Sequence, residues 1–204
     1  MLDALAPDRP WTHAATLLLA TAADDLEAGA TPAPTLAAYR GDEPLAVTTL
    51  RPFADGELLQ ALIEVFALLI PLGTDRVALS VTGRAWSLDD QIVPTGDEVD
   101  LRARVVLLIL ADAHDGTCTT RTEIHPFEQD ADGWCFGPPL EIGDHPADTG
   151  VDEALAALLN GRDDLAASTT DQMIAAQLGR VLLLGHTIAL APDAAADLEG
   201  RTGR

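Results

Sequence analysis

The residues best suited to chemistry are five carboxylates within the fourteen residues from 87 to 100. Carboxylate oxygens are the ligands that hard divalent cations prefer in proteins. The spacing does not match the calcium-binding loop of helix–loop–helix proteins, because no ligands alternate ahead of a glycine. We therefore expect a binding loop without a defined metal site. Its acids are Asp89, Asp90, Asp97, Glu98 and Asp100.

Cationic and aromatic side chains flank this acidic loop. Arg84 and Trp86 precede it, and Arg102 follows it. Guanidinium groups at both ends would hold a solvated loop through surface salt bridges, which stabilise little on their own. Long loops are also often functional, so both interpretations stay open. The predicted binding site comprises Arg84, Trp86, Asp89, Asp90, Asp97 and Arg102.

The other reactive side chains form no known catalytic pattern. Glu123 and His125 share one face of a predicted strand, which fits a charged face or a small polar network as well as catalysis. No serine lies in a GxSxG elbow, and neither cysteine has a CxxC partner. The chain contains no lysine, which excludes Walker phosphate loops, pyridoxal Schiff bases and Ser–Lys pairs. We expect no cofactor and no metal, and the balance is against an enzyme.

The charge of the chain limits its partners. It has 33 acidic residues against 12 arginines, a formal net charge of -21. Such a chain repels phosphate backbones and anionic lipid surfaces, so we expect no nucleic-acid partner and no membrane partner. The acids are spread evenly along the sequence, which favours a general compositional bias. The N-terminus has early acids and no basic segment, unlike a signal peptide, so a cytoplasmic location is expected.

The hydrophobic pattern predicts an α+β fold. Residues 10–28 read as an N-terminal helix, and residues 35–40 as a short helix or extended piece. A strand, a buried helix at 55–70 and a second strand form a β-α-β start. The expected sheet is mostly antiparallel and five-stranded, with flanking N- and C-terminal helices. Its strands cover residues 45–50, 77–86, 104–111, 118–127 and 134–142.

These elements suggest three parts of the chain. Residues 1–34 would form a helical arm and linker, and residues 35–148 the α+β sheet core. Residues 149–204 would form C-terminal helices packed on that core, with a frayed end from Pro192 onward.

Aromatic residues provide the second candidate site. Phe127, Trp134 and Phe136 gather at the second hairpin, and Trp11 begins the apolar stripe of the first helix. They pack in a core or form an interface, because an aromatic edge strand left open invites pairing with another chain. The leading hypothesis is a non-catalytic interaction or regulatory module that acts as a homo-oligomer or binds a protein partner. The alternative is a small metal-dependent hydrolase-like enzyme that uses the loop at 87–100.

Overall fold

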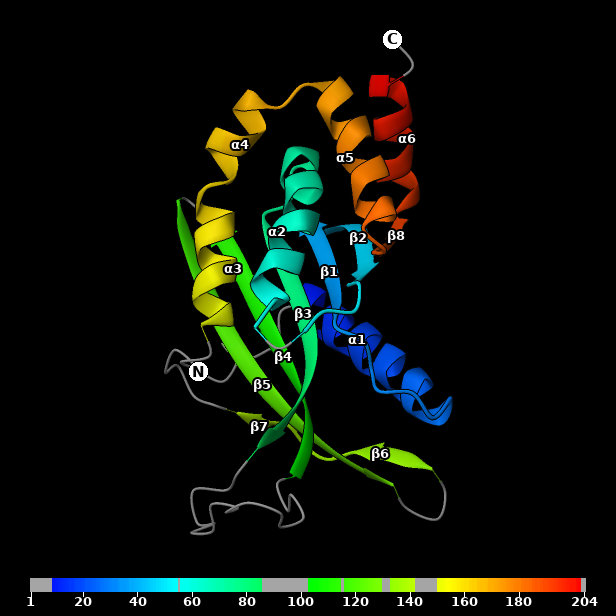
Figure 1. Ribbon diagram of the computed structural model, residues 1–204. Coiled ribbons are helices and arrows are strands. Elements are labelled where there is room, and N and C mark those ends of the chain that lie inside the picture. Colours follow the sequence, from blue (N-terminus) through cyan, green and yellow to red (C-terminus); the bar gives the residue numbers. More distant parts are fainter. Residues whose placement is uncertain are drawn as a thin grey trace.

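The computed structural model describes residues 9–54, 56–85, 103–114, 116–129, 133–141 and 150–202. Within them the fold is α+β, as expected (Figure 1). The helices are α1 (Arg9–Glu27), α2 (Leu58–Leu69), the 3-10 helix η2 (Ile70–Leu72), α3 (Val151–Asn160), α4 (Arg162–Ser168), α5 (Asp171–Leu183) and α6 (Pro192–Thr202). The strands are β1 (Thr35–Arg40), β2 (Glu43–Thr49), β3 (Arg76–Ala85), β4 (Ala103–His114), β5 (Thr117–Gln129), β6 (Trp134–Phe136), β7 (Leu140–Glu141) and β8 (Thr187–Leu190).

The sheet is antiparallel and larger than expected. Its described strands follow the order β6-β5-β4-β3-β1-β2-β8, with β7 also paired to β5. The prediction of five strands is therefore wrong. The segment at 35–40 is strand β1, β8 is an additional strand, and the strand expected at 134–142 is divided into β6 and β7. Two prolines, Pro138 and Pro139, lie in that division and have no N–H to donate to a ladder.

The predicted β-α-β start is present with one addition. Strands β2 and β3 both pair antiparallel with β1, so they run parallel to each other and α2 connects them. Strand β1 lies between them, and β3, β4 and β5 form the expected antiparallel series.

Helices cover both faces of the sheet (Figure 1). Alternate residues of β1 belong to different cores: Leu36 and Ala38 pack toward α2, α3, α5 and α6, whereas Ala37 and Tyr39 pack toward α1. This alternation is the period of a strand buried on both faces. The first core is the larger, and α2 lies at its centre between α3 and α5 (Figure 1).

Helix α2 confirms the buried helix expected after residue 50. Six of its apolar residues are buried against the sheet and neighbouring helices: Ala61, Leu62, Val65, Phe66, Leu68 and Leu69. The chain then turns through Pro71 in η2 and Gly73, whose φ of 93° suits glycine. Two large apolar side chains, Leu59 and Ile63, stay on the exposed side of α2.

Helix α1 covers the opposite face. Ala14, Leu18, Ala22 and Leu26 recur every fourth residue and are buried against β1, β3 and β4. At the start of α1 the Arg76 guanidinium carbon lies 5.1 Å from the Trp11 ring centroid, a cation–π contact.

The C-terminal segment differs from the sequence reading. Thr170 caps α5 by accepting a hydrogen bond from the Met173 N–H. Residues expected to fray form helix α6, which buries Ala194 and Leu198 in the first core. None of the helices in the described ranges is long and apolar enough to cross a membrane.

Candidate functional site

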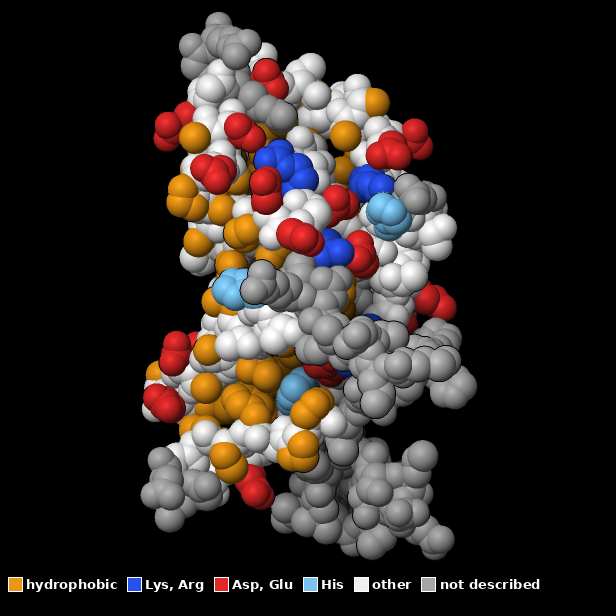
Figure 2. Space-filling view, turned by 180° about the vertical axis from the view of Figure 1, so that it is seen from behind, with side chains coloured by type: hydrophobic (Ala, Val, Ile, Leu, Met, Phe, Trp, Pro, Cys, Tyr) orange, Lys and Arg blue, Asp and Glu red, His pale blue; other side chains and the backbone are white. Residues whose placement is uncertain are grey.

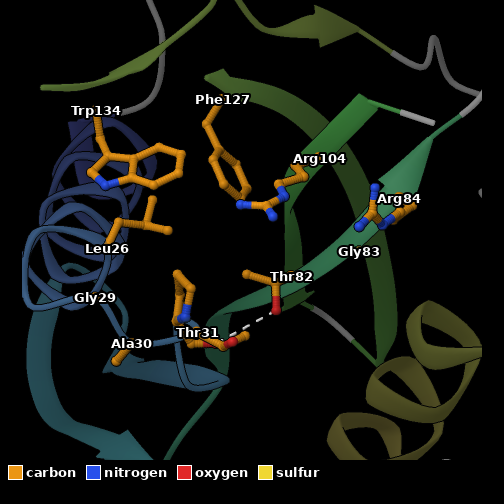
Figure 3. Close-up of a pocket in the computed structure, with 11 residues that line it drawn as sticks. Leu26, Gly29, Ala30, Thr31, Thr82, Gly83, Arg84, Arg104, Phe127 and Trp134 are labelled. Atoms are coloured by element: carbon orange, nitrogen blue, oxygen red, sulfur yellow. Dashed lines mark hydrogen bonds between the residues drawn. The ribbon is translucent and has the colours of Figure 1, made fainter. Parts of the chain in front are cut away.

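A cavity of about 450 Å³ opens on the α1 side of the sheet (Figure 3). It lies between the C-terminal end of α1, the connection from α1 to β1, and the ends of β3, β4, β5 and β6. The residues that line it are Leu26, Gly29, Ala30, Thr31, Pro32, Thr82, Gly83, Arg84, Arg104, Phe127 and Trp134.

Strand register brings two arginines to this cavity. Arg84 of β3 is the direct cross-strand partner of Arg104 of β4. On β3 the side chains of alternate residues point to one face, so Arg84 lies on the same face as Ala78, which contacts α1. Both arginines are exposed, and like charges directly opposite each other on neighbouring strands repel.

Aromatic residues form the other wall of the cavity. Phe127 of β5 pairs with Phe136 of β6, with ring centroids 5.9 Å apart. The Trp134 ring meets Phe127 edge to face at 5.7 Å. Phe127 is buried, whereas Trp134 and Phe136 are half-buried beside α1. Figure 2 shows hydrophobic side chains gathered in the lower half of this side of the molecule, among scattered acids.

The structure thus brings together residues from both predicted sites. Arg84, assigned to the binding loop, shares the cavity with Phe127 and Trp134, assigned to an interface. Trp86, Asp89, Asp90, Asp97 and Arg102 lie outside the described residues. Trp11 sits at the other end of α1, over Arg76. Strand β6 ends the described sheet, which is the edge position expected for Trp134 and Phe136.

The sequence reading missed Arg104. It ended one predicted strand at 86 and began the next at 104, and pairing those two ends would have set Arg104 opposite Trp86, two residues from the observed partner Arg84. The signal was therefore the register between neighbouring strands, not the residue type alone.

A second polar cluster lies on the helical face, centred on Glu64 of α2. Its carboxylate accepts hydrogen bonds from Arg51 Nε at 2.8 Å and Arg51 Nη2 at 3.1 Å. His186 Nε2 lies 3.0 Å from Glu64 Oε2, and Gln60 Nε2 donates to Oε1 at 3.1 Å. These bonds, above all the one from Arg51, lower the Glu64 pKa from 4.5 to about 2 despite the opposing effect of desolvation.

Both ring nitrogens of His186, the histidine in this cluster, make hydrogen bonds. The Arg51 backbone N–H donates to His186 Nδ1 at 3.2 Å, so the ring proton lies on Nε2 and is donated to Glu64. His186 is buried, with both nitrogens bonded. It therefore joins the start of β8 to α2 and to Arg51, two residues after β2, and has no free nitrogen to accept a substrate proton.

A third cluster lies on β5. Glu123 accepts from Arg121 Nη2 at 2.8 Å and contacts His125 Nε2 at 3.2 Å. The bond from His125, followed by the charge of Arg121, lowers the Glu123 pKa although burial opposes it. Arg121, Glu123 and His125 therefore form a small polar network on β5. Across the described ranges, no three His, Cys, Asp or Glu side chains are grouped to hold a metal ion.

An apolar ridge and a strand edge lie at the opposite end of the sheet. Leu182 and Leu183 end α5 and Leu184 is its C-cap, and their exposed fractions are 52%, 90% and 37%. The chain then turns at Gly185, where φ is 93°, and enters β8, the last strand of the described sheet.

Comparison of the chain with protein-family models, curated proteins and solved structures finds no match. The functional argument therefore depends on geometry alone.

Proposed function

We propose that this chain is a non-catalytic interaction module that self-associates through the edge of β8 and the adjoining leucine ridge, Leu182–Leu184. The single observation that carries the proposal is this open strand edge, which begins three residues after three exposed leucines and belongs to a strand that contacts α5.

The edge of β8 is suited to strand addition. The Ala191 N–H donates to the Leu45 carbonyl, so residues 187, 189 and 191 bond toward β2. The polar backbone groups of Ile188 and Leu190 consequently point to the other side, where no described strand pairs with them. The sequence TIAL carries no charge and no proline, the usual protections of an edge.

The leucine ridge supplies apolar area to the same contact. Full burial of a leucine side chain is worth about 1.5–3 kcal/mol. Clustered exposed apolar residues mark interaction sites more often than scattered ones. An antiparallel pairing of β8 with β8 of a second copy is symmetric, and sets each ridge beside the far end of the partner's strand.

Charge makes the proposed association dependent on salt. Each copy carries a formal charge of -21, so two copies repel at low ionic strength. Screening shortens the reach of that repulsion to about 8 Å at physiological ionic strength. We expect the dimer to strengthen as sodium chloride is added, and sedimentation velocity at several salt concentrations measures this. A chain that stays monomeric throughout would contradict the proposal.

The variant Leu183→Glu tests the surface directly. A carboxylate at the most exposed position of the ridge should weaken association at least tenfold, because dimerisation would desolvate two added charges. Leu165→Glu on α4 is the matched control, since Leu165 is also an exposed leucine but lies off the ridge. Ala189→Glu, on the exposed face of β8, should act like Leu183→Glu. Equal dimerisation of Leu183→Glu and Leu165→Glu would exclude this interface.

The hydrolase alternative rests on residues 87–100, which lie outside the described ranges. No observation on the described residues favours it, and we do not propose it.

A further inference from the structure

We infer that the cavity between α1, β3, β4 and β6 is a binding site for a small organic acid, whose carboxylate meets Arg104 and whose apolar body lies against Trp134 and Phe127. This inference is independent of self-association, which uses the opposite edge of the sheet.

Two arginines, Arg84 and Arg104, line one side of the cavity. The chain has only 12 arginines against 33 acidic residues, yet two of these arginines are cross-strand partners here. Arg104 has no ion-pair partner among the described residues, whereas Arg84 has an interaction of its own. In a chain this acidic, a guanidinium group without an ion-pair partner beside a cavity favours an anion from solution, which forms charge-assisted hydrogen bonds with it.

The cavity has a charged end at Arg104 and an apolar wall beside it. In Figure 3 the Arg104 guanidinium extends alongside the Phe127 ring toward the space enclosed by Trp134, Leu26 and Thr82. Arg84 lies farther along β3. A ligand with its anionic group at Arg104 would therefore place its remainder over the Phe127, Trp134 and Leu26 side chains.

The size and lining select the class of ligand. A volume of about 450 Å³ lies in the range of small-molecule sites, roughly 300–1,000 Å³. Thr82 donates its hydroxyl proton to the Pro32 carbonyl at 3.5 Å, so its oxygen is left as an acceptor. Arg104 is then the charged donor directed at the cavity, and a planar carboxylate matches the guanidinium fork. The aromatic wall favours an organic acid over inorganic phosphate, which has no apolar part to bury.

Isothermal titration calorimetry with indole-3-acetate tests this inference, with indole-3-acetamide as the neutral isostere. We expect the acid to bind at least tenfold more tightly than the amide, because the amide has no negative charge and only one acceptor oxygen and cannot form a bidentate ion pair with a guanidinium. Binding should weaken with added salt, since the guanidinium groups are exposed. Inorganic phosphate should bind more weakly than indole-3-acetate.

Arg104→Gln should reduce the affinity for indole-3-acetate at least tenfold. Arg180→Gln removes the same charge from an exposed position on α5 and should leave the affinity unchanged, which separates a local contact from the net charge. Equal binding of acid and amide, equal effects of the two substitutions, or phosphate binding as tight as that of the organic acid would each overturn the assignment. Absence of any binding at millimolar ligand would overturn it too. Unchanged circular dichroism of Arg104→Gln shows that lost binding is not lost folding.

Discussion

Replacing Phe66 with alanine is expected to lower the free energy of unfolding by about 4 kcal/mol. Phe66 is 1% exposed and lies on α2 at the centre of the larger core. Its removal loses the transfer free energy of the ring and leaves a cavity that the packed sheet and helices cannot fully close. Domains are typically stable by only about 5–15 kcal/mol, so this single change removes a large share.

Urea denaturation followed by circular dichroism measures the change. Leu59→Ala is the control on the same helix, because Leu59 is 47% exposed and should lose only about 0.5 kcal/mol. A similar loss in both variants would mean that the exposed side of α2 is also covered, which would revise the position of this helix in the fold.

The parts of the fold that were predicted from the sequence depend on local patterns. The buried helix followed from the narrow polar stripe of α2, and β3 from the alternation of Val77 and Leu79 with Ala78 and Ser80. The alternation in β3 predicted a strand with one buried face, but Ala78 and Ser80 on its other face are buried too, where α1 covers the sheet. The N-terminal helix followed equally from apolar residues at helical spacing.

The parts that were missed depend on distant residues. Strand β8 has only four residues, and it is a strand because Ile188 pairs with Thr48 of β2. A segment of four residues is too short to show the alternation of apolar and polar residues that identifies a strand. Helix α6 is rich in Ala and Asp and looks frayed in sequence, but it is fixed by burial of Ala194 and Leu198 in the core. Tertiary contacts override weak local preference in both segments.

The candidate sites also combine residues that the sequence indicated with partners that only the fold brings near. Arg84 was selected for its position beside an acidic loop, but its relation to Arg104 and Trp134 arises from strand register and from α1 crossing the sheet. Glu64 was read only as part of the polar stripe of α2. Its partner His186 is 122 residues away, and no spacing rule connects two residues so far apart.

Replacing Glu64 with glutamine is expected to lower the free energy of unfolding by about 2 kcal/mol, because hydrogen bonds to a charged acceptor are lost. In the native cluster each carboxylate oxygen accepts two donors: Oε2 from Arg51 and His186, and Oε1 from Arg51 and Gln60. A glutamine side chain must turn its NH₂ group toward one of these pairs, where donor faces donor. Glu153→Gln on the exposed side of α3 is the control and should change stability little.

The pH dependence of this loss separates a charge effect from a packing effect. The folded pKa of Glu64, about 2, lies below its ordinary value of 4.5. The carboxylate therefore stabilises the fold fully above about pH 4.5, and this contribution disappears as the pH falls toward about 2. The stability gap between wild type and Glu64→Gln should accordingly be constant near neutral pH and narrow between those two values. Urea denaturation of both proteins across this range measures the gap. A gap that stays the same at every pH would mean that Arg51 and His186 do not act on the ionised carboxylate, and that Glu64 is held only by its shape.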